Sequence, residues 1–218
     1  MPNDSWYYWQ MSEPGSSLRV RKKLKTREAI VDAALTLFEE RGFDEVTVTE
    51  IADRAEVGRS TFFRYFTDKR EVLFDDRDEW LAVLTEACGA VARQCAPIGD
   101  SVTSALVVAR AGLIAYADRI GADAARFALR QKLVDGHPEL RARNLVKEQD
   151  YLAAGIDVMV RHGATPDTAT LAAHLALACF AAARARTLSA GGRLARAVDD
   201  EFARLASIDA AELAAVLR

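Results

Sequence analysis

This chain of 218 residues has few of the side chains on which catalysis and metal binding commonly depend. Its cysteines, Cys88, Cys95 and Cys179, form no C-x-x-C pair and have no histidine at ligand spacing, so a zinc site is not expected. The histidines are scattered, and no Ser/His/Asp or Cys/His arrangement accompanies them. We therefore expect no metal, no cofactor and no enzymatic activity.

Long apolar runs are also scarce. We see no run that approaches the ~20 residues of a membrane span, and the N-terminus lacks the charged region and apolar core of a secretion signal. With an odd number of cysteines, these absences favour a cytoplasmic protein with free thiols. A redox sensor that uses Cys88 and Cys95 is the alternative for those two residues.

Positive charge is not in excess either, because the net charge is −3. Any affinity for nucleic acid must therefore come from a local patch. Residues 19–27 provide one, with six basic side chains and no acid: Arg19, Arg21, Lys22, Lys23, Lys25 and Arg27. Such a block is either a solvated tail or a nucleic-acid-binding arm. The aromatic-rich residues 1–18 before it are expected to be a disordered tail, with a true start at Met11 or an aromatic contact to DNA or a partner as alternatives.

Residues 47–66, TVTEIADRAEVGRSTFFRYF, are typical of two short helices joined by a tight turn. Thr47 and Glu50 form a T-x-x-E capping box, in which each side chain binds a backbone N–H at the helix start. Apolar residues then recur at the spacing of one buried helical stripe: Val48, Ile51, Ala52 and Ala55. In the second helix, Phe62 and Phe66 are four residues apart and are expected to point inward.

The other face of the second helix suits a DNA major groove, which admits an α-helix and displays different groups for each base pair. We expect Arg59 to pair with guanine, Ser60 to bond to several bases, and Phe63 to contact a thymine methyl group. Three further side chains are assigned to phosphates, which fix register without reading sequence: Arg64, Tyr65 and Lys69. An ordinary helical hairpin with a solvated face is the alternative.

A third helix is expected ahead of this pair, from a cap at Thr26 to Arg41. Its apolar residues recur at helical spacing: Ile30, Ala33, Ala34, Leu37 and Phe38. Gly42 fits the left-handed residue that commonly ends a helix. The three helices would form a head over about residues 24–66, which favours the arm interpretation of the basic segment.

The segment from Thr26 to Phe74 resembles the N-terminal domain of TetR-type transcriptional regulators. The resemblance rests on three runs: A-x-x-L-F-x-x-x-G-F (34–43), T-V-x-x-I-A (47–52) and T-F-F-R-Y-F-x-x-K (61–69). It implies an all-α fold, in which a three-helix helix-turn-helix DNA-binding head precedes an antiparallel helical ligand-binding and dimerisation domain. We accordingly expect residues 1–18 to be a tail, 19–67 the arm and DNA-binding domain, and 68–218 the second domain.

The resemblance also implies roles for individual residues. Thr47 matches a phosphate-contacting helix cap, and Thr49 matches a position that can reach a base. The whole expected DNA-binding set is Lys25, Arg27, Thr47, Thr49, Gly58, Arg59, Ser60, Thr61, Phe63, Arg64, Tyr65 and Lys69. Three positions depart from the family pattern. Glu56 stands where glycine is usual and is strained if its φ is positive, Gly58 is a weaker cap than serine or threonine, and Phe63 lacks the hydroxyl of a common tyrosine.

Further helices are expected downstream, separated by glycine and proline: about 68–95, 101–120, 122–134, 139–161, 166–188, 194–205 and 207–217. The helix over 166–188 is rich in alanine and apolar on nearly every side, so it must be buried on nearly every side. It is either the central helix of a monomeric bundle or part of an interface. Because the resemblance implies that the last two long helices form a symmetric dimer, we assign residues 166–217 to homodimerisation.

The helices of residues 68–162 are expected to enclose a mostly apolar ligand cavity. The candidate lining residues, each equally consistent with ordinary packing, are Trp80, Leu84, Tyr116, Phe127, Arg130, Gln131, Tyr151 and His174. Arg130 or His174 would counter an anionic ligand.

The sequence therefore predicts a homodimeric, ligand-responsive TetR-type repressor. Its expected partners are a near-palindromic double-stranded DNA operator, a second copy of the chain and a small-molecule effector, with no membrane. In the expected mechanism, the effector tilts the helix that starts near Asp68 and changes the separation of the two heads. A DNA-binding activator or a ligand-independent regulator is the alternative. A helical enzyme or a protein-interaction module without DNA affinity is a further one.

Overall fold

The computed structural model describes residues 18–75 and 77–208, and in these residues every regular element is helical. The expected all-α fold is confirmed. The chain divides into two compact units, Met1–Asp75 and Asp76–Arg218, so the division lies slightly beyond the expected one at residue 67. The expected tail lies outside the described residues, except for Leu18, which begins the first described helix.

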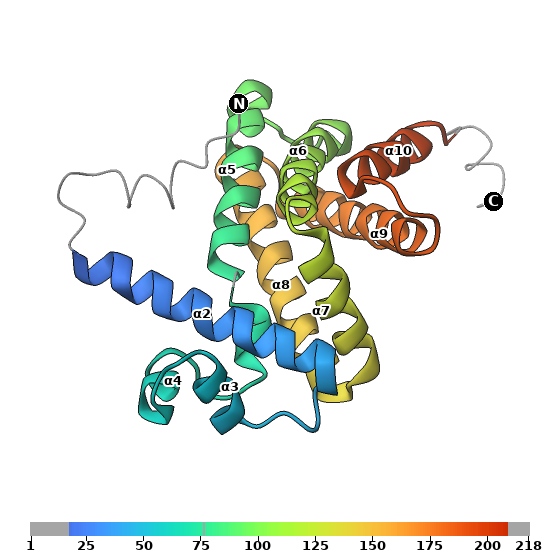
Figure 1. The fold of residues 1–218 in the computed structure, drawn as a ribbon. Coiled ribbons are helices and arrows are strands. Elements are labelled where there is room, and N and C mark those ends of the chain that lie inside the picture. The colour runs from blue at the N-terminus through green and yellow to red at the C-terminus, as the bar shows by residue number, and fades with distance from the viewer. Residues whose placement is uncertain (1–17, 76, 209–218) are drawn as a thin grey trace. The chain divides into compact units, whose positions relative to one another are not determined.

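The first unit contains α2 (Leu18–Arg41), α3 (Val48–Arg54), α4 (Arg59–Tyr65) and a short 3-10 helix, η1 (Glu71–Phe74), as Figure 1 shows. The predicted helix start at Thr26 was wrong. Thr26 lies inside α2, where its Oγ1 donates to the carbonyl oxygen of Lys22 at 2.9 Å. The physical reason is that lysine, arginine and leucine are strong helix formers, so the basic segment extends the helix toward its N-terminus.

Aromatic and aliphatic side chains form the core of the first unit. The largest of them are almost fully buried: Ile30, Phe38, Phe43, Val46, Ile51, Phe62 and Phe66. The rings of Phe38 and Phe43 lie 5.0 Å apart and join the end of α2 to the following turn. Gly42 makes that turn with a φ of +83°, as its expected role as a helix stop requires.

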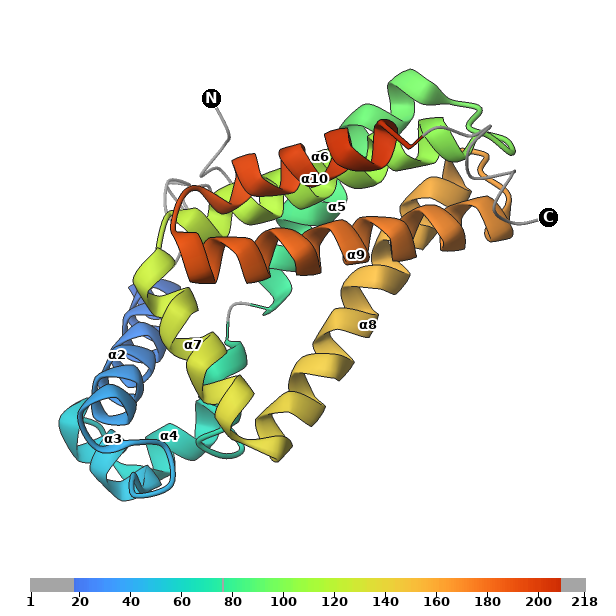
Figure 2. The same cartoon turned by 90° about the vertical axis from the view of Figure 1, so that its right-hand side faces the viewer.

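The second unit contains α5 (Arg77–Cys95), α6 (Val102–Gly121), α7 (Ala124–Gly136), α8 (Pro138–Arg161), α9 (Pro166–Ala190) and α10 (Leu194–Ala206), shown in Figure 2. The expected helix over 68–95 is instead two elements, η1 and α5. Asp68 Oδ1 accepts from the backbone N–H of Arg70 and Glu71, so this cap starts η1 and not α5. Of the expected helix over 207–217, only Ser207 and Ile208 are described, and Ser207 ends α10.

Helix α9 packs against α6, α8 and α10, but the expectation that it is buried on nearly every side was wrong, because Leu171, Ala178 and Ala185 are exposed. Residues 166–187 have a mean hydropathy of 1.3 and are long and apolar enough to cross a membrane. The expectation that no run approaches a membrane span was therefore wrong by length and composition. The cause is the run of alanines, which here lets three neighbouring helices approach α9.

Two close contacts fix the neighbouring helices. Helices α5 and α6 approach at Gly112, where a Cβ atom would lie only 2.3 Å from the Sγ of Cys88. The loops that follow α5 and α8 are joined by a parallel bridge between Gly99 and Ala164. In this bridge the Gly99 N–H donates to the carbonyl of Gly163 at 2.9 Å, and the N–H of Thr165 donates to Gly99 at 3.1 Å.

Candidate DNA-binding surface and ligand pocket

The start of α3 is held by the predicted capping box. The Oγ1 of Thr47 accepts from the Glu50 N–H at 3.3 Å, and Glu50 Oε2 accepts from the Thr47 N–H at 2.8 Å. Arg41, at the end of α2, donates to the other Glu50 oxygen at 2.5 Å. This bond to Arg41, followed by the two bonds from Thr47, lowers the pKa of Glu50 from 4.5 to about 2. The carboxylate therefore joins α2 to the first turn of α3 while Thr47 and Thr49 stay exposed.

Helix α4 separates apolar from polar side chains as predicted. Phe62 and Phe66 are buried, with ring centroids 5.7 Å apart. Arg59 and Phe63 lie on the opposite face, where the guanidinium carbon is 5.5 Å from the centre of the Phe63 ring. Phe63 is 46% exposed, although a phenyl ring that served only the core would be covered.

Four more of the expected DNA-binding residues belong to α4. Ser60 and Arg64 are exposed, and Thr61 and Tyr65 are half-buried. The Cζ atom of Arg64 lies 5.3 Å from the centre of the Tyr65 ring. This helix therefore presents several hydrogen-bonding side chains to solvent beside one exposed aromatic ring.

The turn between α3 and α4 contains two of the departures from the family pattern. Glu56 has a φ of +54°, which is the left-handed conformation that glycine adopts at no steric cost. Gly58 is the N-cap of α4 and makes no side-chain cap bond. Its φ of −68° suits any residue, and a Cβ atom there would meet only Ser60 Oγ at 3.8 Å.

Two basic residues assigned to DNA instead hold the first unit together. Lys69 Nζ donates to the carbonyl oxygens of Phe43 at 2.7 Å, Asp44 at 3.2 Å and Val46 at 2.9 Å. An ammonium group has three N–H donors, so the assignment of Lys69 to a phosphate gives way to a structural role. Arg27 forms an ion pair with Asp75 and lies over the ring of Phe66 at 5.5 Å.

In contrast to these two, Lys25 is exposed on α2. Its role as a phosphate contact stays a prediction.

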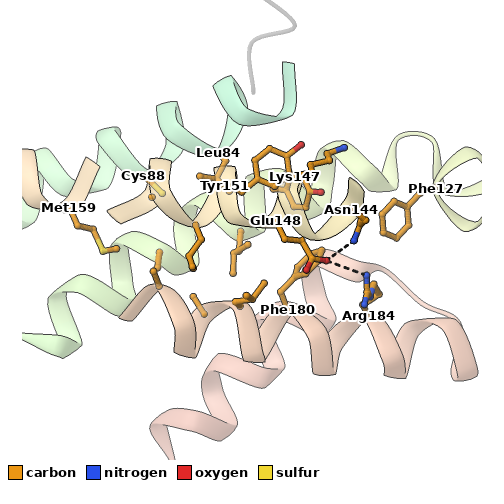
Figure 3. A pocket seen from close by; sticks show the side chains of 18 of the residues that line it. Leu84, Cys88, Phe127, Asn144, Lys147, Glu148, Tyr151, Met159, Phe180 and Arg184 are labelled. Atoms are coloured by element: carbon orange, nitrogen blue, oxygen red, sulfur yellow. Dashed lines mark hydrogen bonds and ion pairs between the residues drawn. The ribbon is translucent and has the colours of Figure 1, made fainter. Parts of the chain in front are cut away.

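The second unit contains a cavity of about 80 Å³ between α5, α6, α7, α8 and α9. Figure 3 shows Cys88 and Met159 toward one end, and Asn144, Glu148 and Arg184 toward the other. Its walls are mostly apolar and aromatic, with Tyr116, Phe127, Tyr151 and Phe180 among the lining residues. A few polar groups in an apolar cavity are typical of a small-molecule site.

The polar end of the cavity is a small network. Arg184 NH1 donates to Oε1 of Gln131 at 2.9 Å and lies 4.0 Å from Oε1 of Glu148. Asn144 donates to that same Glu148 oxygen at 2.8 Å. Lys147 is buried nearby, with Nζ 4.4 Å from the centre of the Trp80 ring. These groups come from α7, α8 and α9, so three helices meet at this end.

Five of the eight ligand candidates line the cavity: Leu84, Tyr116, Phe127, Gln131 and Tyr151. Trp80 and Arg130 are buried behind the wall, where Arg130 Cζ lies 4.3 Å from the centre of the Trp80 ring. The candidate His174 was wrong, because it is exposed on α9 and its Nδ1 lies 2.8 Å from the carbonyl oxygen of Thr170.

Sequence analysis missed the polar lining residues Asn144, Lys147, Glu148 and Arg184. A signal for the first three was present. On α8 they fall on the same face as the lining residues Tyr151, Gly155 and Met159, at spacings of three and four. Polar side chains on an inward helical face indicate a cavity or a buried network.

The cysteines do not form a redox pair in this structure. All three are free, and Cys88 lines the cavity while Cys95 is half-buried at the end of α5. Burial raises the pKa of the Cys88 thiol to about 11. Because the thiolate is the reactive form, Cys88 is a poor nucleophile and acts as a small apolar wall residue.

Comparison with known proteins assigns the first unit to a family. The sequence profile described as bacterial regulatory proteins, tetR family, matches residues 30–75, which contain α3, α4 and the buried part of α2. Residues 30–75 thus form a DNA-binding domain of the TetR type. The chain is 33% identical over 139 residues to the HTH-type transcriptional regulator TcmR of Streptomyces glaucescens, covering 62% of this chain and 59% of TcmR.

A second relative is the putative mycofactocin biosynthesis transcriptional regulator MftR of Mycobacterium tuberculosis. The identity to MftR is 29% over 132 residues, covering 61% of this chain and 63% of MftR. The chain thus spans less than two thirds of the length of each of these two relatives.

Solved structures of TetR-family regulators share the fold. Thermus thermophilus FadR, a TetR-family repressor in complex with lauroyl-CoA, aligns with 81% of this chain and 91% of its own, at 23% identity and a TM-score of 0.53. The SmeT–triclosan complex aligns with 82% and 90%, at 19% identity and a TM-score of 0.54. At these identities the likeness concerns the fold alone.

Proposed function

We propose that this chain is a homodimeric TetR-type transcriptional repressor that binds a near-palindromic operator and releases it when a small molecule enters the cavity of the second unit. The proposal rests on the separation of buried apolar side chains from exposed polar and aromatic ones on α4. Phe62 and Phe66 fill the core, which leaves Arg59, Ser60 and Phe63 exposed on a helix that fits a major groove. The match of residues 30–75 to the tetR profile supports the same assignment.

Within the head we assign two kinds of contact. Arg59 reads guanine and Phe63 contacts a thymine methyl group, because these side chains share one exposed face of α4. Lys25, Thr47, Thr61, Arg64 and Tyr65 contact phosphates, and Ser60 and Thr49 reach base edges. The first N–H groups of α4 have no side-chain cap from Gly58 and add donors toward the DNA backbone.

The exposed side of α9 supports the homodimer. Its residues at spacings of three and four are small or apolar and exposed: Leu171, Ala178, Ala181 and Ala185, with His174 among them. Such a stripe lets a second helix approach closely, and a two-fold dimer would place two heads on successive major grooves. We place this dimer in the cytoplasm, where operator DNA is accessible.

The cavity supports the response to a ligand. FadR of T. thermophilus is described with lauroyl-CoA and SmeT with triclosan, so proteins of this fold bind organic molecules with large apolar parts. We propose that an effector in the cavity favours a tilt of the segment that follows Asp68 and so changes the separation of the heads. Since coupling between two sites is reciprocal, the effector must bind the operator complex more weakly than the free protein.

The decisive experiment selects bound duplexes from random DNA and measures their affinity by fluorescence anisotropy. Arg59→Ala should weaken the selected duplex by ~1–3 kcal/mol and relax the preference at one base pair. Arg54→Ala is the matched control, because Arg54 is exposed in the same unit but pairs with Glu40 of α2. An equal loss on all duplexes from Arg59→Ala would contradict base reading, and no DNA affinity would favour the interaction-module alternative.

A reporter gene under the selected operator then distinguishes a repressor from an activator. Repression relieved by a cavity ligand is the expected result. An activated reporter, or an operator affinity that a confirmed cavity ligand leaves unchanged, would contradict the proposed mode of regulation.

A further inference from the structure

The small cavity in the second unit has a larger neighbour, and the two share part of their walls. A second hollow of about 590 Å³ lies between the end of α6, the start of α7 and the turn that joins α9 to α10. Phe127 and Arg184 line both hollows. The two hollows therefore adjoin at these two side chains, which a ligand can reach from either space.

The inner cavity is lined by several aromatic rings. Tyr116 packs edge-on against Tyr151 at 5.3 Å and lies 5.5 Å from Phe180, measured between ring centroids. Phe127 adds a fourth ring at the junction of the two hollows. Aromatic pairs prefer offset-stacked or edge-to-face contacts, and rings in these orientations provide both faces and edges for an aromatic guest.

The charge at the junction favours an anion. Arg184 NH1 donates to the neutral amide of Gln131, while Glu148 is 4.0 Å away, which exceeds hydrogen-bond distance. The carboxylate of Glu148 already accepts from Asn144 at 2.8 Å. A ligand carboxylate at Arg184 would replace a bond to a neutral amide by an ion pair, in which both partners are charged and two parallel hydrogen bonds can form.

The position of Arg184 also limits the cost of desolvation. Its side chain is 29% exposed, in contrast to the almost fully buried Lys147. An anion at Arg184 would keep part of its hydration from the outer hollow. Arg193 and Asp118 also line that hollow and pair with each other at 3.1 Å, so the net positive charge of its lining comes from Arg184.

We propose that the effector is a planar aromatic compound with one acidic group, whose rings lie among Tyr116, Tyr151 and Phe180 and whose anion binds Arg184 where the two hollows meet. This assignment rests on the proposed function only in taking the cavity as the effector site. It disfavours a cationic amphiphile, because a positive group at the junction would lie beside Arg184, and Glu148 already accepts from Asn144 and lies 4.0 Å from Arg184.

Isothermal titration calorimetry with three matched probes tests the proposal: 2-naphthoate, 2-naphthalenemethanol and 2-naphthylmethylammonium. We expect 2-naphthoate to bind at least about tenfold more tightly than the neutral alcohol, in line with one charged hydrogen bond. Arg184→Gln should remove that preference and leave the affinity for the alcohol within about twofold. Arg196→Gln is the control, since Arg196 is exposed on α10 and lines neither hollow.

Equal affinity for the three probes, the tightest binding by the ammonium, or a preference that survives in Arg184→Gln would overturn the proposal. Absence of binding by every probe would overturn the aromatic class. If Arg184→Gln does not fold, Arg184→Lys replaces it, and a reduced but remaining preference for 2-naphthoate is then expected. The affinity of the unliganded protein for its operator is measured in a separate experiment. If the unliganded protein does not bind DNA, the proposed function is contradicted, but the proposed ligand class is not.

Discussion

Lys69 is a single side chain that holds the turn before α3 in place. Its ammonium gathers the carbonyl oxygens of Phe43, Asp44 and Val46, and Nζ lies 4.5 Å from the centre of the Phe43 ring. The family motif suggests a phosphate contact for Lys69, but its hydrogen bonds indicate that it stabilises the fold of the first unit. It orients α3 by bonding to the segment that leads into it.

Lys69→Met should accordingly lower the free energy of unfolding by roughly 1–3 kcal/mol, because buried carbonyl groups lose a charged donor. Urea denaturation measures this, with Lys25→Met as the control that stays within about 0.5 kcal/mol. The two variants should behave in the opposite way toward DNA. Lys25→Met should reduce the slope of log affinity against log salt by about one, whereas folded Lys69→Met leaves that slope unchanged. A reduced slope for Lys69→Met would restore its role as a phosphate contact.

Glu56 is a second residue whose effect is local. Its left-handed backbone, with a φ of +54°, costs of order 1–2 kcal/mol for a residue with a Cβ atom. Glu56→Gly removes that strain but gives the unfolded chain more freedom, so a net gain of about 0.5–1 kcal/mol is expected in the same urea assay. Glu56→Ala keeps the Cβ atom and should give no such gain. A gain from alanine equal to that from glycine would show that the glutamate charge, and not its φ, is unfavourable.

At the scale of helices, Gly112 sets how closely α5 and α6 approach. A methyl group there would meet Cys88 Sγ at 2.3 Å and the carbonyl oxygen of Leu84 at 3.1 Å. Gly112→Ala should therefore destabilise the second unit by about 1–3 kcal/mol, as overpacking does. Gly89→Ala on α5 is the control, because its Cβ atom would meet only Arg93 at 3.5 Å.

A double-mutant cycle then identifies the clash. Cys88→Ala removes the sulfur atom that Gly112→Ala would meet, so the loss in the double variant should be smaller than the sum of the two single losses. Thermal unfolding followed by circular dichroism gives the three values. Strict additivity would mean that the Leu84 carbonyl, and not Cys88, resists the added methyl group.

The helices also show which parts of a fold can be predicted from a sequence. Proline, glycine and capping residues predicted α6 to α10 closely, because each such residue acts within one turn of the helix end. Thr26 misled because a threonine can also bond to the carbonyl four residues earlier inside a helix. The polar cavity end was not predictable as a unit, since Gln131, Glu148 and Arg184 come from three helices that only the tertiary fold brings together.

At the scale of the whole molecule, operator recognition depends on two copies of the chain. The exposed stripe of α9 is the proposed contact, and Ala178 and Ala182 lie one turn apart on that side. The double variant Ala178→Glu, Ala182→Glu should be monomeric in sedimentation velocity, because buried carboxylates without partners are costly. The affinity for the operator should also fall, because a monomer has one head and contacts only one half-site.

Ala142→Glu provides the control for this change, because Ala142 is exposed on α8 and lies outside the proposed contact. It should remain a dimer with unchanged operator affinity. A dimer that persists in the α9 double variant would move the interface to another surface of the second unit.

The bridge between Gly99 and Ala164 holds one end of the second unit together. It ties together the far ends of α5 and α8, and Figure 2 shows α8 and α9 meeting beside it and spreading apart toward α7. Because backbone hydrogen bonds hold the bridged end, the opposite end, where α8 and α9 separate toward α7, is the part that can widen. Asn144, Glu148 and Arg184 lie at this opposite end. A ligand that separates these groups would therefore move α7 and the N-terminal half of α8 outward, while the bridged end stays in place.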